Sequence, residues 1–193
     1  GRDAVLGGLC FISATKDTDG AVLHLGRPAK ITFGERDGRA SSARVDAFAD
    51  ACAQAGIDHL ASPAISQEQW VKYSFLTALA AATCLLRADI GTIVATQDGA
   101  DIVRGLYAEC LVVAEADGQP IPDAARATAL ENLLQPGSKM KASMLRDLEA
   151  GQQVEAEQIV GDMLVRARAA GHAAPLLQVA YSGLQAYQAQ RGG

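Results

Sequence analysis

The stretch that most constrains the fold of this chain runs from Gln67 to Leu86, with the sequence QEQWVKYSFLTALAAATCLL. From Tyr73 onward it contains no charge and is rich in Ala and Leu, which is typical of a helix that is buried on most sides. Ser66 and Gln69 have the spacing of a capping box, which predicts that the helix begins there. We therefore expect the rest of the chain to be built around this helix.

Lys72 is the last charge before the uncharged part of this helix. An ammonium group that enters an apolar core must reach water or be held by a carboxylate, because an unpaired buried charge costs roughly several kcal/mol. A lysine that is held in this way is suited to act as a general acid. The alternative is that Lys72 lies in the exposed first turn of an ordinary core helix, and this stretch alone leaves both interpretations open.

The composition argues against several classes of function. The 193 residues carry a net charge of -5 without a Lys/Arg cluster, so we expect no binding of nucleic acid. The longest uncharged run is shorter than the ~20 residues that cross a bilayer, so we expect no membrane insertion. The three His and four Cys residues are scattered without ligand spacing, which predicts no metal site and favours reduced thiols in a cytoplasmic protein.

Two kinds of hydrophobic pattern divide the chain near residue 65. Short β-rich segments with turn signals come first and predict strands and one helix, over residues 4–14, 21–25, 30–33 and 41–56. Helical periodicity follows and predicts helices over residues 67–86, 97–116, 122–134, 138–150, 154–170 and 175–190. The predicted fold is a short α/β portion, residues 1–65, followed by an all-α portion, residues 66–193.

A second informative segment runs from Ala142 to Gly161. It places Ser143 on one predicted helix and Glu155 at the start of the next, where the helix dipole favours a carboxylate. Two helices that meet at a short turn would direct both groups into one cleft. The alternative is that both are surface residues without a role. The chain contains no glycine-rich phosphate-binding motif of the G-x-G-x-x-G or G-x-x-x-x-G-K-[ST] type.

Four motifs together resemble the ketopantoate reductase family. They are G-G-x-C-x-I-S-A at residues 7–14, F-G-E at 33–35, W-x-K at 70–72, and S-M-L-R-D-L-E-A-G at 143–151 followed by V-E at 154–155. The resemblance covers essentially the whole chain. It implies NADPH-dependent reduction of 2-dehydropantoate to pantoate, in pantothenate biosynthesis. It also implies an N-terminal Rossmann domain and a C-terminal helical domain like that of 6-phosphogluconate dehydrogenases.

The resemblance also implies roles for individual residues. Lys72 matches the general acid of the family, and Ser143 matches a serine that binds polar groups of the substrate. Glu155 matches a glutamate that supports the lysine and contacts substrate or cofactor. Leu76 and Ala80 occupy substrate-binding positions one and two turns after the lysine, where many family members have asparagine. We therefore expect a substrate pocket that is more apolar than usual.

The later helix departs from the family in the same direction, because the E-x-D-x-x-N run reads Glu155, Glu157 and Val160 here. An apolar wall discriminates less strongly than a site that hydrogen-bonds a substrate hydroxyl, so the exact 2-oxo acid stays open. The phosphate-binding strand, turn and helix of the family would precede Gly1. We therefore expect this chain alone to bind NADPH poorly.

Two hypotheses about function remain. In the first, the chain is the catalytic and substrate-binding half of an NADPH-dependent 2-oxo acid reductase. In the second, the helical portion is a dimerisation or regulatory module without catalysis. A homodimer is one expected assembly.

Overall fold

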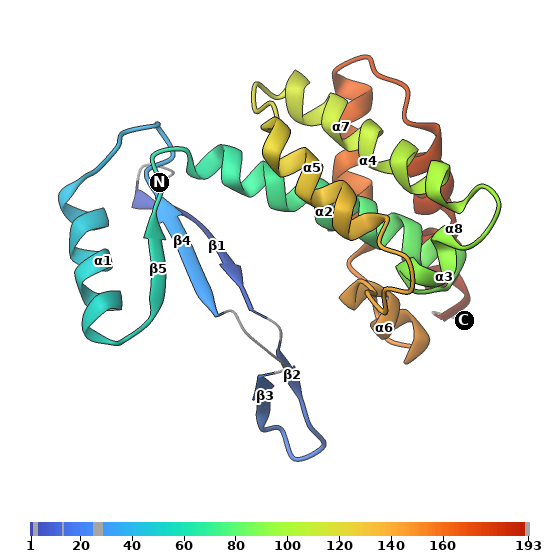
Figure 1. Ribbon diagram of the computed structural model, residues 1–193, viewed down its shortest axis with the longest axis horizontal. Coiled ribbons are helices and arrows are strands. Elements are labelled where there is room, and N and C mark those ends of the chain that lie inside the picture. Colours follow the sequence, from blue (N-terminus) through green and yellow to red (C-terminus); the bar gives the residue numbers. More distant parts are fainter. Residues whose placement is uncertain (2–3, 13, 25–28, 192–193) are drawn as a thin grey trace. The chain divides into compact units, whose positions relative to one another are not determined.

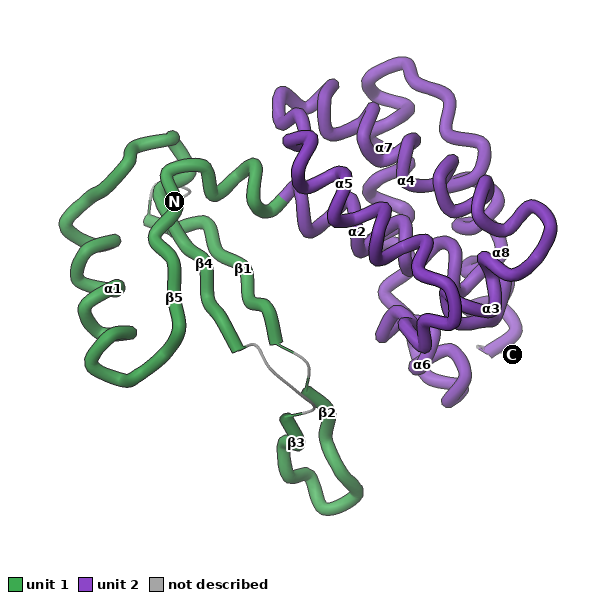
Figure 2. The backbone as a smooth tube through the Cα atoms, in the orientation of Figure 1, with its two compact units in different colours: residues 1–69 green, residues 70–193 purple. Residues whose placement is uncertain are grey.

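The computed structural model describes residues 1, 4–12, 14–24 and 29–191, which form two compact units (Figures 1 and 2). Unit 1 comprises residues 1–69 and unit 2 residues 70–193. The division falls within helix α2 (Ile65–Leu86). Ser13 of the first motif and Leu25 of the second predicted strand lie outside the described residues.

Unit 1 contains a three-stranded sheet in the order β1 (Gly7–Phe11), β4 (Lys30–Gly34) and β5 (Asp58–Ala61). β1 and β4 are antiparallel, with Gly7 opposite Gly34, whereas β4 and β5 are parallel, with Lys30 opposite Asp58. A separate antiparallel hairpin consists of β2 (Ala14–Lys16) and β3 (Val22–His24). The β-rich run over residues 4–14 therefore contributes to two sheets rather than to one.

Helix α1 (Ala43–Gln54) connects the parallel strands β4 and β5 and packs against the sheet. The hydroxyl of Ser42 caps the helix by accepting a hydrogen bond from the Val45 N–H at 3.3 Å. Phe33 of β4 is buried and contacts Phe48 of α1 edge to face, with ring centroids 4.5 Å apart. These contacts make a βαβ unit in which the crossover helix covers the parallel pair.

The ends of β4 and β5 approach each other closely. A Cβ atom added to Gly34 would lie 2.0 Å from the carbonyl oxygen of Ser62, so only glycine fits this position. The chain then turns into α2, which begins at Ile65. The prediction that Ser66 caps this helix was therefore wrong. Ile65 is 1% exposed and lies against Gly34, so its packing fixes the start of the helix.

All the regular secondary structure of unit 2 is helical within the described residues. Besides most of α2 it contains α3 (Ile90–Val94), α4 (Gly99–Ala116), α5 (Asp123–Leu133), α6 (Ser143–Glu149), the π-helix η2 (Glu157–Gly161), α7 (Asp162–Ala169) and α8 (Pro175–Arg191). The consecutive α2 residues from Thr77 to Cys84 are each at most 4% exposed, so every face of this part of the helix is covered. This confirms the prediction of a helix buried on most sides.

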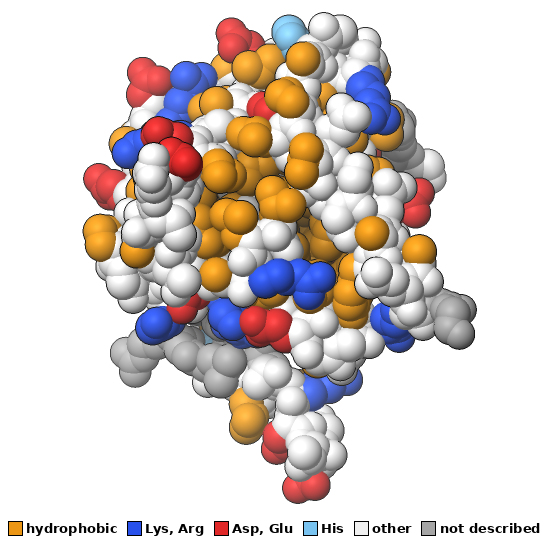
Figure 3. Space-filling model, turned by 90° about the vertical axis from the view of Figure 1, so that its right-hand side faces the viewer, with side chains coloured by type: hydrophobic (Ala, Val, Ile, Leu, Met, Phe, Trp, Pro, Cys, Tyr) orange, Lys and Arg blue, Asp and Glu red, His pale blue; other side chains and the backbone are white. Residues whose placement is uncertain are grey.

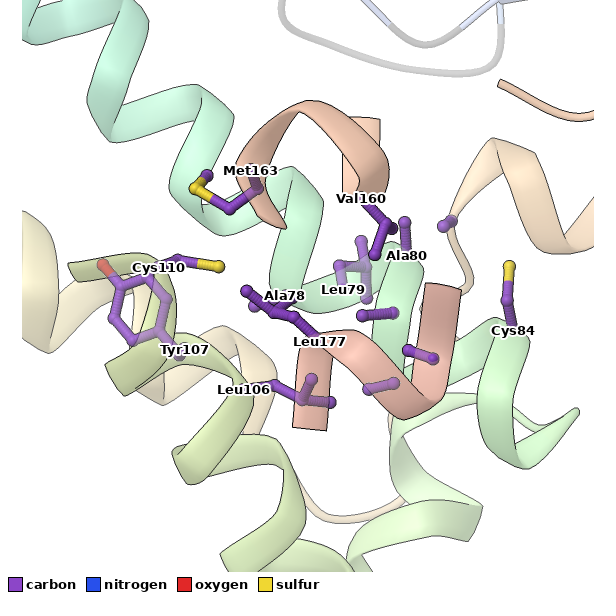
Figure 4. Close-up of a cluster of buried hydrophobic side chains, with 14 of the residues drawn as sticks. Ala78, Leu79, Ala80, Cys84, Leu106, Tyr107, Cys110, Val160, Met163 and Leu177 are labelled. Atoms are coloured by element: carbon purple, nitrogen blue, oxygen red, sulfur yellow. The ribbon is translucent and has the colours of Figure 1, made fainter. Parts of the chain in front are cut away.

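The core of unit 2 forms where other helices close around α2. Leu106 of α4, Val160 of η2, Met163 of α7 and Leu177 of α8 are fully buried and surround α2 in Figure 4. The outer face carries hydrophobic side chains as well, and Figure 3 shows a group of them with charged side chains near its margin. No helix among the described residues is long and apolar enough to span a bilayer.

The helix predicted to start at Ser138 begins only at Ser143. The segment before α6 instead accepts hydrogen bonds from the first turn of α3. The carbonyl of Ser138 accepts a hydrogen bond from the N–H of Gly91 at 2.8 Å, and that of Met140 accepts one from Ile90 at 3.0 Å. These two N–H groups belong to the first turn of α3 and have no partner within that helix.

Candidate active site

Lys72 lies on α2, just after the start of unit 2, and its side chain is half-buried. Leu76 and Ala80 follow at intervals of four residues, which places all three on one face of the helix. Exposure falls along this face from 37% at Leu76 to 3% at Ala80. The two predicted substrate-binding positions therefore differ, because Leu76 is partly exposed whereas Ala80 is buried, and their contact with substrate stays a prediction.

Ala80 and Val160 both belong to the buried hydrophobic core of unit 2 (Figure 4). Val160 is 0% exposed and belongs to η2, which carries it against α2. These are two of the positions at which the family resemblance would have placed asparagine. Both apolar replacements are buried, so neither brings a polar side-chain group into the core that would need a hydrogen-bond partner.

Glu155 lies two residues before the start of η2, and its side chain is exposed. Its carbonyl oxygen accepts a hydrogen bond from the Ile159 N–H at 3.1 Å, so the residue stands at the start of the helical segment. The helix predicted over residues 154–170 therefore exists, but residues 157–161 of it form a π-helix rather than an α-helix. π-Helical turns occur frequently at functional sites.

Tyr73 connects the helix of Lys72 to the segment that follows Glu155. Its hydroxyl lies 2.9 Å from the Ile159 carbonyl oxygen and 2.9 Å from Asp162 Oδ2. Burial and the hydrogen bond to Asp162 raise the pKa of Tyr73 above its ordinary value, so the hydroxyl stays a donor. The structure thus brings the elements that carry Lys72 and Glu155 together, and the pairing of their side chains stays a prediction.

Helix α8 holds the loop that leads into Glu155. Three side chains of α8 donate hydrogen bonds to carbonyl groups of this loop: Tyr187 to Gln152 at 2.7 Å, Gln188 to Val154 at 3.1 Å and Arg191 to Gly151 at 2.8 Å. Each of these bonds satisfies a carbonyl outside regular secondary structure. The segment before Glu155 is therefore fixed at three of the four residues 151–154.

Ser143 is the first residue of α6, and its side chain is exposed. The helix is anchored by Met144, Leu145 and Leu148, which are buried in the core of unit 2. No hydrogen bond joins the Ser143 side chain to Lys72 or Glu155 within the described residues. Its predicted contact with substrate stays a prediction.

The sequence reasoning missed Tyr73 and Asp162. A tyrosine inside an otherwise apolar helix is a usable signal, because a buried phenol needs a hydrogen-bond partner. The partner could not be found in this way, since Asp162 lies far along the sequence and its approach depends on the π-helix. No spacing rule predicts that contact.

Other chemistries find little support in the described residues. No group of three or more His, Cys, Asp and Glu side chains there could hold a metal ion. Burial raises the pKa of the Cys84 thiol to about 12 and raises that of Cys110 as well, so neither is a thiolate at neutral pH. These thiols are therefore unsuited to act as nucleophiles.

In unit 1 the conspicuous charged group is Glu35, the last residue of the F-G-E motif. Its carboxylate is 3% exposed and accepts hydrogen bonds from the Ser42 hydroxyl at 2.5 Å and from Arg44 Nε at 2.8 Å. The hydrogen bonds from Arg44 and Ser42 lower the pKa of Glu35 to about 2. Glu35 therefore anchors the start of α1 to the end of β4, at the edge of the βαβ unit.

Comparison with known proteins agrees with this architecture. Residues 64–188 match the family described as "Ketopantoate reductase PanE/ApbA C terminal". The chain is 32% identical over 190 residues to the uncharacterized oxidoreductase YkpB of Bacillus subtilis, covering 98% of this chain and 62% of that protein. It is 28% identical over 176 residues to the 2-dehydropantoate 2-reductase of Halobacterium salinarum, covering 91% of this chain and 57% of that protein.

Among solved structures, the 2-dehydropantoate 2-reductase of Methylococcus capsulatus superposes with a TM-score of 0.83 at 30% identity. The superposition covers 97% of this chain and 64% of that one, so the chain spans about three fifths of the length of its relatives. The sheet remnant followed by a helical domain, as predicted, is confirmed by this match. The chain belongs to the ketopantoate reductase (PanE/ApbA) family, and residues 64–188 are its match to the C-terminal domain of that family.

Proposed function

We propose that the protein containing this chain reduces a 2-oxo acid with NADPH, with 2-dehydropantoate as the first candidate substrate and pantoate as the product. The observation that carries the proposal is the position of Lys72. It is half-buried on α2 within the family-matched region, and Tyr73 ties its helix turn to the segment that begins at Glu155. A cation held at such a place suits a reaction that develops negative charge on an oxygen.

NADPH, when bound, supplies a hydride to the keto carbon. The parallel βαβ unit of unit 1 suits a dinucleotide-binding sheet, and Glu155 is the residue of this chain that we assign to contact with cofactor or substrate. Lys72 donates a hydrogen bond to the keto oxygen and then the proton that makes it a hydroxyl. Ser143 binds a polar group of the substrate, and Leu76 contacts its carbon skeleton.

A second candidate substrate class is a 2-oxo acid whose side chain lacks a hydroxyl group. It is favoured by the partly exposed Leu76 and by the apolar, buried Ala80 and Val160. Apolar side chains gain from burying methyl groups but offer no hydrogen bond to a hydroxyl. The cytoplasm, as the location, and a homodimer, as the assembly, remain parts of the same proposal.

The test is an assay of the full-length protein with a panel of 2-oxo acids and with both nicotinamide cofactors. We expect oxidation of NADPH with 2-dehydropantoate or with a related branched 2-oxo acid, and slower turnover with NADH. Absence of turnover with every 2-oxo acid, in a folded protein that binds NADPH, would contradict the proposed reaction. It would favour the alternative of a helical binding or dimerisation module.

A further inference from the structure

Beside Lys72 lies a closed group of five side chains, which we call the tryptophan–tyrosine cluster: Trp70, Tyr73, Asp117, Asp162 and Arg166. Trp70 Nε1 donates to Asp117 Oδ2 at 3.1 Å, and Arg166 Nη1 reaches Asp117 Oδ1 at 3.4 Å. Arg166 Nε donates to Asp162 Oδ2 at 2.7 Å, and the Tyr73 hydroxyl shares its single proton between that oxygen and the Ile159 carbonyl, each 2.9 Å away. The cluster connects α2, the end of α4 and α7.

Ring contacts complete the cluster. The rings of Trp70 and Tyr73 are tilted against each other with centroids 5.5 Å apart. The Arg166 guanidinium lies over the Trp70 ring, with Cζ 5.5 Å from the centroid. Asp117 is the C-cap residue of α4, where the helix dipole disfavours a carboxylate, so the donors from Trp70 and Arg166 offset an unfavourable position. Every polar side-chain group of the cluster therefore has a partner.

The cluster holds the α2 backbone near Lys72, whereas the Lys72 side chain lies on another face of the helix. Trp70 and Tyr73 are three residues apart and share one face of α2, whereas Lys72 is turned about 100° away from Tyr73 around the helix. Tyr73 is the next residue after Lys72, and its hydroxyl bonds the carbonyl of Ile159. Ile159 in turn donates its N–H to the Glu155 carbonyl. The contact between Tyr73 and Ile159 is therefore one residue from Lys72 on one side. On the other side it is one helical turn from Glu155.

We propose that Tyr73 is a positioning residue, which sets the distance between the α2 turn carrying Lys72 and the π-helix η2, which begins two residues after Glu155. The inference rests on the proposed function, since it assigns Tyr73 a task only if Lys72 and Glu155 act together. Asp162 and Arg166 keep the phenol in place and protonated, and Tyr73 itself touches neither substrate nor cofactor. The π-helix is part of this arrangement, because it carries the Ile159 carbonyl that the hydroxyl meets.

The first test is Tyr73→Phe in the full-length protein, which keeps the ring against Trp70 and removes only the hydroxyl. We expect kcat to fall about 10- to 100-fold with KM within about threefold, because a small displacement of a reacting group slows the chemical step more than it weakens binding. Tyr181→Phe is the matched control. Tyr181 is also half-buried in unit 2, and its hydroxyl makes no hydrogen bond within the described residues. We expect its kinetics to be unchanged.

A double-mutant cycle separates positioning from general loosening of the fold. If Tyr73 acts through the pair, its substitution should cost at least about threefold less in kcat when Glu155→Gln is already present. Equal costs in both backgrounds would overturn the proposal. If Tyr73→Phe does not fold, Asp162→Asn carries the same test, because it keeps an acceptor oxygen but loses the charge that holds Tyr73 and Arg166.

Measuring Lys72→Ala in parallel distinguishes a failure of the proposed function from a failure of the positioning role of Tyr73. A large loss for Lys72→Ala together with unchanged kcat for Tyr73→Phe overturns the positioning role and leaves the proposed function standing. Unchanged kcat for Lys72→Ala overturns the function and the positioning role together. Large losses for both variants, with the coupling described above, support both.

Discussion

Leu76 is the position at which the apolar site can be tested most sharply. It lies one turn after Lys72 and is 37% exposed. 2-Dehydropantoate and 3,3-dimethyl-2-oxobutanoate form a matched pair of substrates, since they differ by a single hydroxyl group. An apolar face cannot hydrogen-bond that hydroxyl, so we expect the two kcat/KM values to differ by no more than about 100-fold.

Leu76→Asn should change this preference. A new hydrogen bond to the hydroxyl is worth about 0.5–1.5 kcal/mol, which would raise the ratio of kcat/KM in favour of 2-dehydropantoate roughly 2- to 13-fold. The substitution also removes apolar burial. Complete burial of a leucine is worth about 1.5–3 kcal/mol, and Leu76 buries somewhat less than two thirds of its surface, so we expect a stability loss of about 1–2 kcal/mol.

The assay is steady-state oxidation of NADPH with both substrates, together with urea denaturation of each variant. Leu86→Asn is the control, because Leu86 lies on the same helix and is 39% exposed. It should lose similar stability and keep the substrate ratio of the unsubstituted protein. A preference for 2-dehydropantoate above about 10³-fold before any substitution would refute the reasoning, since some polar group would then already be reading the hydroxyl.

Three further predictions concern stability and reactivity. The pKa of Glu35 is lowered from 4.5 to about 2 in the folded state, so its contribution to stability is present above pH 4.5 and is lost as the pH falls toward 2. Thermal melts across that range should therefore show the difference between the unsubstituted protein and Glu35→Gln shrinking with acid. Cys10 is exposed and should be alkylated in the native protein, whereas peptide mass spectrometry should find the three buried cysteines modified only after unfolding. Gly183→Ala should stabilise α8 by about 0.5–1 kcal/mol, because nothing lies within 4 Å of the added Cβ. Gly99→Ala should instead cost about 1–3 kcal/mol, because its Cβ would lie 1.8 Å from the Ile93 carbonyl oxygen. Urea denaturation measures both changes in stability.

The parts of the fold that could be predicted are those in which local pattern and burial agree. The uncharged run on α2 predicts a buried helix, and in the structure residues 77–84 are buried on every face of that helix. The helix predicted over residues 41–56 likewise forms, as α1, with Gly56 at a φ of 68° just after its end, and the structure identifies Ser42 as its N-cap.

The parts that could not be predicted depend on distant partners. β5 has four residues, and only its register with β4 makes it a strand. The segment from Ser138 to Met140 looks helical, yet its carbonyl groups are needed by the first turn of α3. The π-helix and its contact with Tyr73 bring together residues more than 80 positions apart, which no local spacing encodes.

In the candidate site, the sequence motifs selected Lys72, Ser143 and Glu155 through family resemblance rather than through physical pattern. The structure adds what surrounds them: a hydrogen bond from the Tyr73 hydroxyl to the Ile159 carbonyl, hydrogen bonds from α8 to the loop before Glu155, and the burial of Ala80 and Val160 in the core. None of these could be derived from spacing, because each joins elements whose approach is set by the packing of unit 2.

The central claim is that Lys72 donates the proton in reduction of a 2-oxo acid, and the most direct measurement is the kcat of Lys72→Ala in the full-length protein. A positioned acid contributes at least about 100-fold, or about 2.7 kcal/mol, so kcat should fall by that factor or more while the circular dichroism spectrum and melting temperature stay near those of the unsubstituted protein. Unchanged kcat in a folded Lys72→Ala variant would contradict the account.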